Sequence, residues 1–184
     1  MVLLSMSNEA LIIFIKNPVL GKVKTRLAVD VGEEKALEIY KVLLNHLREL
    51  SNTLEMDKYL YYSDYIDKDD EWSAQKYRKH LQAGGGLGKR MEKAFSEVFQ
   101  KGYKKVVLIG SDIYGLKSTV IIRSFRSLDV SDVVIGPAED GGYYLIGMKQ
   151  LIKSPFTLDS WSHPGVLNDT KGKLDEEHYT IELL

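Results

Sequence analysis

Three uninterrupted apolar runs, each followed at once by a polar turn, constrain the fold of this chain more than any other feature. Residues 10–16 read ALIIFIK, residues 104–112 read KKVVLIGSD, and residues 132–137 read DVVIGP. A strand that is apolar at every position is buried on both faces, and such strands belong to parallel sheets that helices cover on both sides. The sequence therefore predicts an α/β fold built around a mostly parallel sheet.

Amphipathic helices are predicted between these strands. Apolar residues recur at spacings of three and four from about residue 33 to residue 50 and again over residues 87–99, and Gly102 follows the second helix. A strand is expected over residues 58–63, a loop with a short surface helix over residues 67–80, and a helix over residues 118–128.

The C-terminal part departs from this alternation of strands and helices. Residues 141–148 read as a strand that follows residues 132–137 so closely that an antiparallel or bent connection is expected, and residues 163–184 read as a short helix and a closing strand. The predicted fold is an α/β three-layer sandwich, mostly parallel, with some antiparallel strands in the C-terminal half.

Composition narrows the classes of function. The 184 residues are 44% hydrophobic and 28% charged, with a net charge of −1, which predicts one domain over residues 1–184 and no general attraction to nucleic acid or anionic membranes. There is no cysteine, which excludes disulfides and thiolate chemistry, and the four histidines lack the spacing of zinc ligands. Since no signal-type or membrane-spanning segment is recognisable, we expect a cytoplasmic protein.

Three polar turns follow the predicted strands and point to one site. Ligands of such sheets bind in the crevice outside the carboxyl ends of the strands. The first turn, in NPVLGKVKTRLA, carries Lys22, Lys24, Thr25 and Arg26. The other two turns, GSD and GPAEDGG, contribute the acidic residues, which are Asp112, Glu139 and Asp140.

Cations beside carboxylates match a phosphate-rich substrate held with a divalent ion. Lysine and arginine bind phosphate oxygens, and carboxylates hold Mg²⁺ or Mn²⁺, which also bridges to phosphate. Each turn alone also has an ordinary structural interpretation, as solvated lysines, a helix cap at Asp112, or a tight Asp-Gly turn. Their common position at one sheet edge favours the functional interpretation, with Asp112 and Asp140 as metal ligands.

The glycine run AGGGLGKR, residues 83–90, is not a Walker loop. Ala83 stands where that motif needs its first glycine, and Arg90 stands where it needs serine or threonine. Two interpretations stay open: residues 84–88, with Gly85 and Gly86 as the candidates, let the backbone approach a base or ribose, or the run is a flexible entry to the following helix.

Four residues near the later turns are weaker candidates for an acceptor site: Glu139, Tyr143, Trp161 and His163. Adjacent strand residues face opposite sides, so only one of Tyr143 and Tyr144 is expected to face the crevice. Trp161 stacks on a sugar or simply packs, and His163 is a candidate base because histidine titrates near neutral pH.

Five segments together carry a family likeness. FIKNPVLGKVKTRLA, LGKRMEKAF, GSDIYGL, GPAEDGGYYLIGM and SWSHPGVLNDT, in this order, resemble the bacterial radical-SAM/selenodomain-associated transferases, also described as glycosyltransferases of arsenosugar biosynthesis. The resemblance implies a GT-A-like, Rossmann-like fold of the nucleotide-diphospho-sugar transferase superfamily. It also implies that Asp112 binds the metal, that Lys24 and Arg26 are the basic residues of the opening loop, and that Asp140 is the acidic residue of the later turn.

The leading hypothesis is a metal-dependent glycosyltransferase that uses a nucleotide sugar and a small-molecule acceptor. Lys24, Arg26 and Asp140 are the proposed catalytic residues, and Lys22, Lys24, Thr25, Arg26, Gly85 and Gly86 the nucleotide-binding ones. A nucleotidyltransferase that uses an NTP and releases pyrophosphate is the alternative. A non-catalytic binding module is a third reading, because Tyr114 and Gly86 depart from the family pattern and the chain ends at Leu184.

Overall fold

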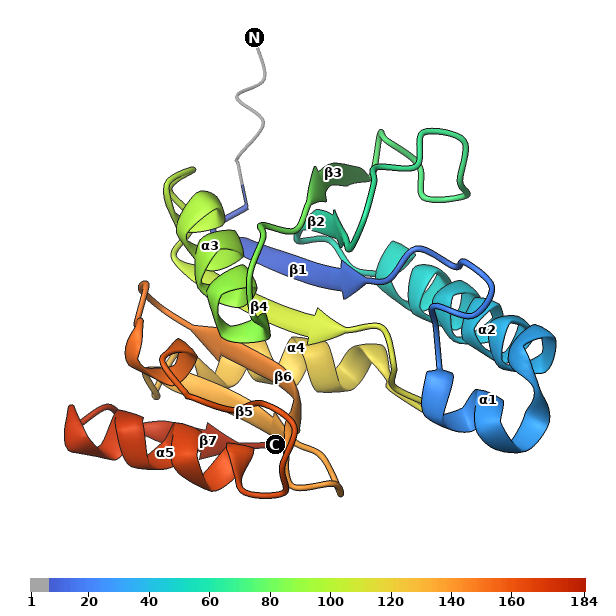
Figure 1. The fold of residues 1–184 in the computed structure, drawn as a ribbon. Helices are drawn as coiled ribbons and strands as arrows, with labels where there is room; N and C mark the ends of the chain where they lie inside the picture. The colour runs from blue at the N-terminus through green and yellow to red at the C-terminus, as the bar shows by residue number, and fades with distance from the viewer. Residues whose placement is uncertain (1–6) are drawn as a thin grey trace, which may run out of the picture.

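The protein is a single seven-stranded sheet covered by helices on both faces (Figure 1). The computed structural model describes residues 7–184. Its strands are β1 (Glu9–Ile15), β2 (Asp57–Tyr62), β3 (Tyr77–Leu81), β4 (Lys105–Gly110), β5 (Val133–Pro137), β6 (Tyr143–Met148) and β7 (Ile181–Leu183). Its helices are α1 (Thr25–Val31), α2 (Glu33–Asn52), α3 (Leu87–Phe99), α4 (Ser118–Ser127) and α5 (Val166–Glu176), with a 3₁₀ turn, η1, at Ser154–Phe156.

The strand order is β3-β2-β1-β4-β6-β5-β7. β1 pairs in parallel with β2 and β4, β2 with β3, and β5 with β7, whereas β6 lies antiparallel between β4 and β5. The short turn between β5 and β6 allows only this antiparallel pairing, because a parallel partner needs a long crossover. The predicted α/β fold, with its antiparallel element in the C-terminal half, is confirmed.

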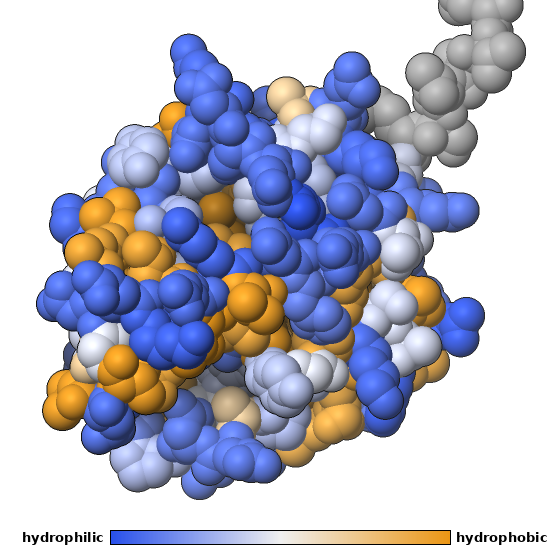
Figure 2. Space-filling view, turned by 90° about the vertical axis from the view of Figure 1, so that its right-hand side faces the viewer, coloured by the Kyte–Doolittle hydropathy of each residue, from blue (hydrophilic) through white to orange (hydrophobic). Residues whose placement is uncertain are grey.

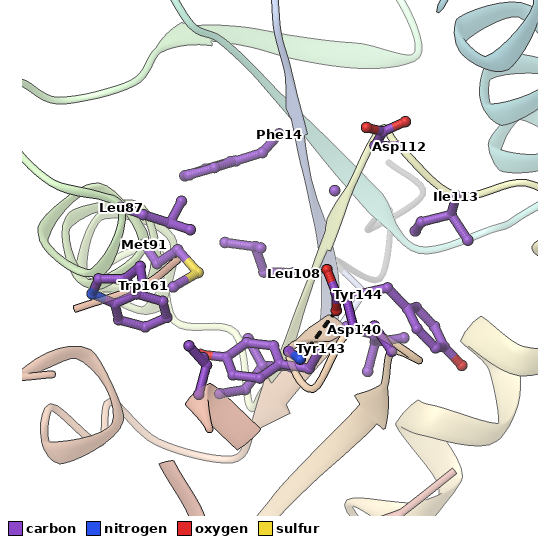
Figure 3. Close-up of a pocket in the computed structure, with 16 residues that line it drawn as sticks. Phe14, Leu87, Met91, Leu108, Asp112, Ile113, Asp140, Tyr143, Tyr144 and Trp161 are labelled. Carbon is purple, nitrogen blue, oxygen red and sulfur yellow. Dashed lines mark hydrogen bonds between the residues drawn. The ribbon is translucent and has the colours of Figure 1, made fainter. Parts of the chain in front are cut away.

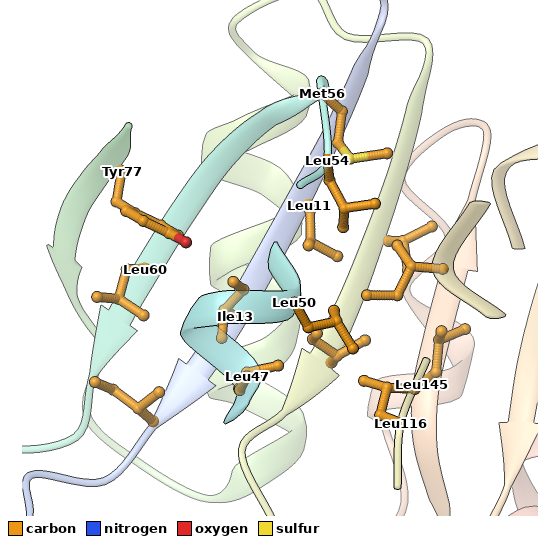
Figure 4. Packing of buried hydrophobic residues seen from close by; sticks show 14 of the residues in the cluster. Leu11, Ile13, Leu47, Leu50, Leu54, Met56, Leu60, Tyr77, Leu116 and Leu145 are labelled. Atoms are coloured by element: carbon orange, nitrogen blue, oxygen red, sulfur yellow. The ribbon is translucent and has the colours of Figure 1, made fainter. Parts of the chain in front are cut away.

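Alternation along β1 divides the core into two layers. Leu11 and Ile13 point to the face covered by α2 and α4, where they pack with Leu47 and Leu50 of α2 (Figure 4). Ile12 and its neighbours on the other face pack against α3, α5 and η1. After its first residue, both faces of the strand are buried, which explains why the rest of its sequence is apolar at every position.

Of the loop and short surface helix predicted for residues 67–80, the loop is confirmed and the helix is wrong. No helix forms there; residues 67–76 are turns and bends, and residues 77–81 form the edge strand β3. An edge strand is partly exposed, so it tolerates polar residues, and its sequence then lacks the apolar pattern typical of a strand. Arg78 lies over the ring of Tyr59 at 5.2 Å, and His80 stacks on Tyr61 with ring centroids 5.1 Å apart.

The opening loop is shorter than expected. Helix α1 begins at Thr25, so Thr25 and Arg26 lie in its first turn and not in a loop. The helical hydrogen bonds start at Lys24, whose carbonyl accepts the Ala28 N–H at 2.9 Å. No residue of α1 is fully buried, so the apolar spacing that predicts a helix is weak here.

No helix within residues 7–184 has both the length and the apolar character needed to cross a membrane. The expectation about an N-terminal signal segment falls mainly on residues 1–6, outside the described part of the chain.

Candidate functional site

A cavity of about 360 Å³ lies at the carboxyl ends of β1 and β4, between the sheet and α3. Figure 2 views the molecule from that side and shows apolar surface among hydrophilic side chains. Two carboxylates, Asp112 and Asp140, line the cavity together with a mostly apolar set: Phe14, Leu87, Met91, Leu108, Ile113, Tyr143, Tyr144, Leu145, Ile146, Trp161 and Val166. The structure thus brings the two predicted metal ligands to one cavity.

The two carboxylates come from different turns. Asp112 stands two residues after the end of β4, and its side chain is 62% exposed. Asp140 lies in the turn between β5 and β6, where its Oδ1 accepts the Gly142 N–H at 3.1 Å (Figure 3). Asp140 Oδ2 carries no hydrogen bond from residues 7–184, so it faces solvent or ligand.

Lys24 forms an ion pair with Asp112. Its backbone is in the left-handed region, with φ of 49°, which is uncommon for a residue with a side chain and clusters at functional sites. The cation of the opening loop and the carboxylate that follows β4 are therefore direct neighbours.

Two buried polar side chains hold these loops in place. Tyr40 of α2 accepts the Lys16 N–H at 2.9 Å and shares a hydrogen bond of 2.8 Å with Ser111, the residue before Asp112. Asn17 donates to the Tyr65 carbonyl at 2.9 Å and fixes the start of the opening loop against the loop after β2. These hydrogen bonds fix the positions of the polar turns at the ends of their strands.

A second hollow of about 230 Å³ adjoins the cavity. Arg26, Asp140, Trp161 and His163 line it, and Asp140 and Trp161 line both spaces. The basic turn and the later acidic turn therefore face a shared region, as the sequence predicts. Lys22, Lys24, Thr25 and Glu139 line neither space.

His163 is poorly arranged to act as a base. Its Nδ1 accepts the Gly165 N–H at 3.1 Å, and its Nε2 lies 3.5 Å from Asp169 Oδ2. A base needs a free lone pair that points at the proton it removes. Both ring nitrogens of His163 have protein neighbours, so this ring orders the loop before α5 in the observed geometry.

The two adjacent tyrosines pack on opposite faces of the sheet, as expected, but both line the cavity, so the prediction that only one of them faces it is wrong. Tyr143 points towards Trp161, and Tyr144 points away from it (Figure 3). Tyr143 and Trp161 meet edge to face, with ring centroids 6.3 Å apart and an interplanar angle of 77°. Burial raises the pKa of the Tyr143 hydroxyl, so this group stays protonated at neutral pH and does not serve as a base.

Close backbone contacts fix Trp161. A Cβ on Gly88 of α3 would lie 2.7 Å from a ring carbon of Trp161 and 2.4 Å from the Phe156 carbonyl. Gly141 has φ of 85°, and a Cβ there would lie 2.0 Å from the Pro164 carbonyl. Glycine is required at both positions, because each lets the segment before α5 approach the rest of the site.

Gly84, Gly85 and Gly86 precede α3 but do not line the cavity. Gly85 has φ of 104°, and Gly86 is the N-cap of α3. Leu87 and Met91, one turn apart on the following helix, reach the cavity instead. The proposed contact of Gly85 and Gly86 with a base or ribose stays a prediction.

The sequence analysis missed the apolar lining and a polar pair near α3. Gln82 is buried and donates to the Ile15 and Tyr61 carbonyls, both at 3.1 Å, while its Oε1 accepts from Arg90 Nη1 at 2.9 Å. A polar residue directly after an edge strand carries little signal. The lining residues Phe14 and Leu108 lie in strands and look like ordinary core.

The two carboxylates suit a metal ion that is bound through a substrate. Within residues 7–184 no group of three or more His, Asp or Glu side chains is arranged to hold a metal ion. Mg²⁺ in nucleotide sites is usually held by one or two carboxylates, with phosphate and water as its other ligands. Asp112 and Asp140 match that pattern, and Asp112 would have to exchange its ion pair with Lys24 for the metal ion.

Solved structures of other proteins have the same fold. A protein from Desulfovibrio desulfuricans, described as a "putative nucleotide-diphospho-sugar transferase", is 32% identical with a TM-score of 0.89, over 97% of this chain and 80% of that one. The 4-diphosphocytidyl-2C-methyl-D-erythritol synthase of Anaerococcus prevotii is 10% identical with a TM-score of 0.56, over 97% and 86%. The CMP:2-keto-3-deoxy-manno-octonic acid synthetase complexed with CTP is 9% identical with a TM-score of 0.57, over 97% and 89%.

The last two likenesses, at such low identity, concern the fold alone. No curated protein sequence matches this chain. A family profile described as "Uncharacterized protein conserved in bacteria (DUF2064)" matches residues 46–163, which include Asp112, Asp140 and Trp161. On this match, which covers more than half of its length, the chain belongs to the DUF2064 family.

Proposed function

We propose that this protein is a transferase that uses an activated nucleotide donor, and specifically a metal-dependent, nucleotide-sugar glycosyltransferase. One observation supports the proposal: Asp112, paired with Lys24, and Asp140 line one cavity at the carboxyl edge of the sheet, and Arg26 lines the adjoining hollow together with Asp140. The 32% identical Desulfovibrio protein, described as a "putative nucleotide-diphospho-sugar transferase", supports the same class. A single cytoplasmic domain over residues 1–184 is part of this proposal.

The cations bind the donor diphosphate in this scheme. Lys24 and Arg26 contact phosphate oxygens and neutralise the charge that develops on the leaving group, with Lys22 and Thr25 as secondary contacts. Asp112 would hold Mg²⁺ or Mn²⁺, which would supply positive charge beside the diphosphate, and Asp140 would be a further ligand when its Oδ2 does not take the acceptor proton. Lys24 would then leave Asp112 and contact the phosphates.

The transfer step needs a base for the acceptor. The acceptor hydroxyl oxygen forms a bond to the anomeric carbon, the bond from that carbon to the diphosphate breaks, and its electron pair stays on the diphosphate oxygen. Asp140 is the proposed base because it lines both spaces and its Oδ2 is free, whereas Glu139 lines neither. The hydroxyl proton passes to the Asp140 carboxylate.

Nucleotidyl transfer is the alternative for the same residues. The fold is shared with a synthetase whose structure holds CTP, and the cations and carboxylates would then contact an NTP. A release assay separates the two reactions: nucleoside diphosphate from a nucleotide sugar supports glycosyl transfer, and pyrophosphate from an NTP with a phosphorylated acceptor supports nucleotidyl transfer. Tight nucleotide binding without turnover in either assay would identify a binding module. The link to radical-SAM proteins and arsenosugars stays a prediction.

A thermal-shift screen of NTPs and nucleotide sugars with Mg²⁺ and Mn²⁺ tests the proposal first, because a ligand that binds the folded state raises the melting temperature. The double variant Lys24→Ala/Arg26→Ala should lose this shift. Lys35→Ala/Lys93→Ala removes two exposed lysines elsewhere and is the charge-matched control. Unchanged nucleotide affinity in the first variant would remove the basis for the phosphate site.

A further inference from the structure

We propose that the inner part of the cavity binds an uncharged ring carried by the acceptor. This part, called the apolar chamber, is lined by Phe14, Leu87, Met91, Leu108, Tyr143 and Trp161. The acceptor hydroxyl then lies at the mouth, beside Asp140. The ring-binding site stands on the cavity alone, and the role of the hydroxyl rests on the proposed function.

The chemistry of the lining selects an uncharged group. Among the residues that line the cavity, Asp112 and Asp140 are the only charged ones, and Figure 3 shows Leu87, Met91 and Trp161 grouped on the far side from Asp112. A charged group would lose its hydration there without gaining a partner, whereas an apolar ring gains from leaving water.

The walls of the chamber favour a flat or cyclic shape. Tyr143 and Trp161 meet edge to face, and Trp161 is held against α3 by its close approach to Gly88. Aromatic faces and the flexible thioether of Met91 pack well against rings. A cavity of about 360 Å³ is far larger than an ordinary packing void and falls within the range of ligand pockets.

The charges at the mouth largely cancel. Lys24 pairs with Asp112, and Arg26 lines the adjoining hollow with Asp140, so the preference for a neutral alcohol over a carboxylate or phosphate of the same size comes from the apolar lining. A ring in the chamber leaves its hydroxyl near Asp140 Oδ2, which accepts no hydrogen bond from residues 7–184. This preference also favours glycosyl transfer over nucleotidyl transfer to a phosphorylated acceptor.

The fluorescence of Trp161 reports on the chamber directly. The chain has two tryptophans, and Trp72 is buried edge to face with Tyr77 away from the cavity, so Trp72→Phe leaves Trp161 as the single reporter. Titration with benzyl alcohol and with cyclohexylmethanol should change this fluorescence saturably. Glycerol and benzoate should bind at least about tenfold more weakly than benzyl alcohol, which a difference of about 1.4 kcal/mol would produce.

A blocking variant completes the test. Leu87→Phe, made in the Trp72→Phe background, places a ring in the chamber and should weaken benzyl alcohol binding at least about tenfold, while Leu81→Phe on the exposed edge of β3 is the matched control. Equal binding of benzyl alcohol and glycerol, or undiminished binding in folded Leu87→Phe, overturns the proposal. If Leu87→Phe does not fold, acrylamide quenching of Trp161 decides: bound benzyl alcohol should shield the indole, and an absence of shielding overturns the proposal.

The nucleotide thermal shift with Mg²⁺ is measured on the same proteins. A nucleotide shift without selective ring binding refutes this inference alone. Selective ring binding without a nucleotide shift refutes the proposed function and leaves the chamber as a binding site for uncharged rings.

Discussion

Replacing Asp112 by asparagine separates a ligand-binding role from a structural one. Asparagine keeps the shape of the side chain and removes its charge, so the ion pair with Lys24 and any contact with a metal ion are lost together. If Asp112 is a metal ligand, metal-dependent nucleotide binding disappears and the fold stays intact. If Asp112 only stabilises the loop after β4, the fold weakens even without ligand.

The structure sets the size of the expected stability change. The Asp112 side chain is 62% exposed and that of Lys24 21%, and ion pairs this accessible to solvent contribute about 0–1 kcal/mol because water and salt screen them. For a chain of 184 residues, about 1 kcal/mol corresponds to roughly 2–4 °C in melting temperature. The ligand-free variant should therefore melt within about 4 °C of the native protein.

The ligand-dependent shift should be larger than that. A nucleotide at about one hundred times its Kd stabilises the folded state by about 2.7 kcal/mol, or roughly 5–11 °C for a chain of this size. Differential scanning fluorimetry with and without Mg²⁺ measures both quantities. Asp112→Asn should lose the part of the shift that depends on Mg²⁺, while binding without metal should be no weaker, because Lys24 is released from its ion pair.

Asp129→Asn is the matched control. Asp129 pairs with Lys105 at 2.7 Å and is 64% exposed, so its loss should cost a similarly small amount of stability and leave nucleotide binding unchanged. Two results would refute the reasoning about Asp112: a fall of more than about 8 °C without ligand, which exceeds any surface ion pair, or a Mg²⁺-dependent shift that survives the substitution.

Three further predictions concern the residues that support the site. Gly141→Ala should cost about 2–4 kcal/mol in unfolding free energy, since the backbone φ is positive and the added methyl group meets the Pro164 carbonyl. Gln82→Leu should cost about 2–4 kcal/mol in urea denaturation, because two strand carbonyls and Arg90 lose their partner. Burial lowers the pKa of His80. Stability should fall as the pH drops from about 7 towards 5, because the unfolded chain binds this proton more readily, and His80→Gln should flatten that slope.

Each of these has a control within the chain. Gly172→Ala adds a methyl group that meets nothing within 4 Å, and Gln150→Leu changes an exposed glutamine; both should change stability by less than about 1 kcal/mol. If Gly141→Ala or Gln82→Leu behaves like its control, the corresponding contact does not support the site. An unchanged pH slope in His80→Gln would show that the slope comes from other groups.

The strands of the sheet could be predicted where full burial gives them a continuous apolar sequence. β1 is buried on both faces over residues 10–15, β4 over residues 106–109 and β5 over residues 133–136, so these positions are all apolar. β3 was not predicted because it is an edge strand with polar residues. Its Arg78 and His80 pack on tyrosine rings of β2, and these contacts form only after folding. α1 escaped because it is seven residues long and buries no residue fully.

The residues of the candidate site also fall into those that the sequence predicts and those that it does not. Asp112 and Asp140 could be located because polar residues directly after buried strands must lie at the carboxyl edge of a sheet. The chamber could not, because Leu108 and Met91 have the spacing of core residues whether they face a neighbour or a cavity. The orientation of His163 could not be predicted from the sequence either, because it depends on a hydrogen bond from the backbone N–H of Gly165.

The contact between Gly88 and Trp161 has an evolutionary consequence. Any side chain at position 88 would collide with both the indole and the Phe156 carbonyl, so the two positions are expected to change together. Relatives with a larger residue at position 88 should carry a smaller one at position 161 and a displaced segment before α5. An alignment sorted by this pair would then divide the family into members that share an acceptor preference with this protein and members that have diverged from it.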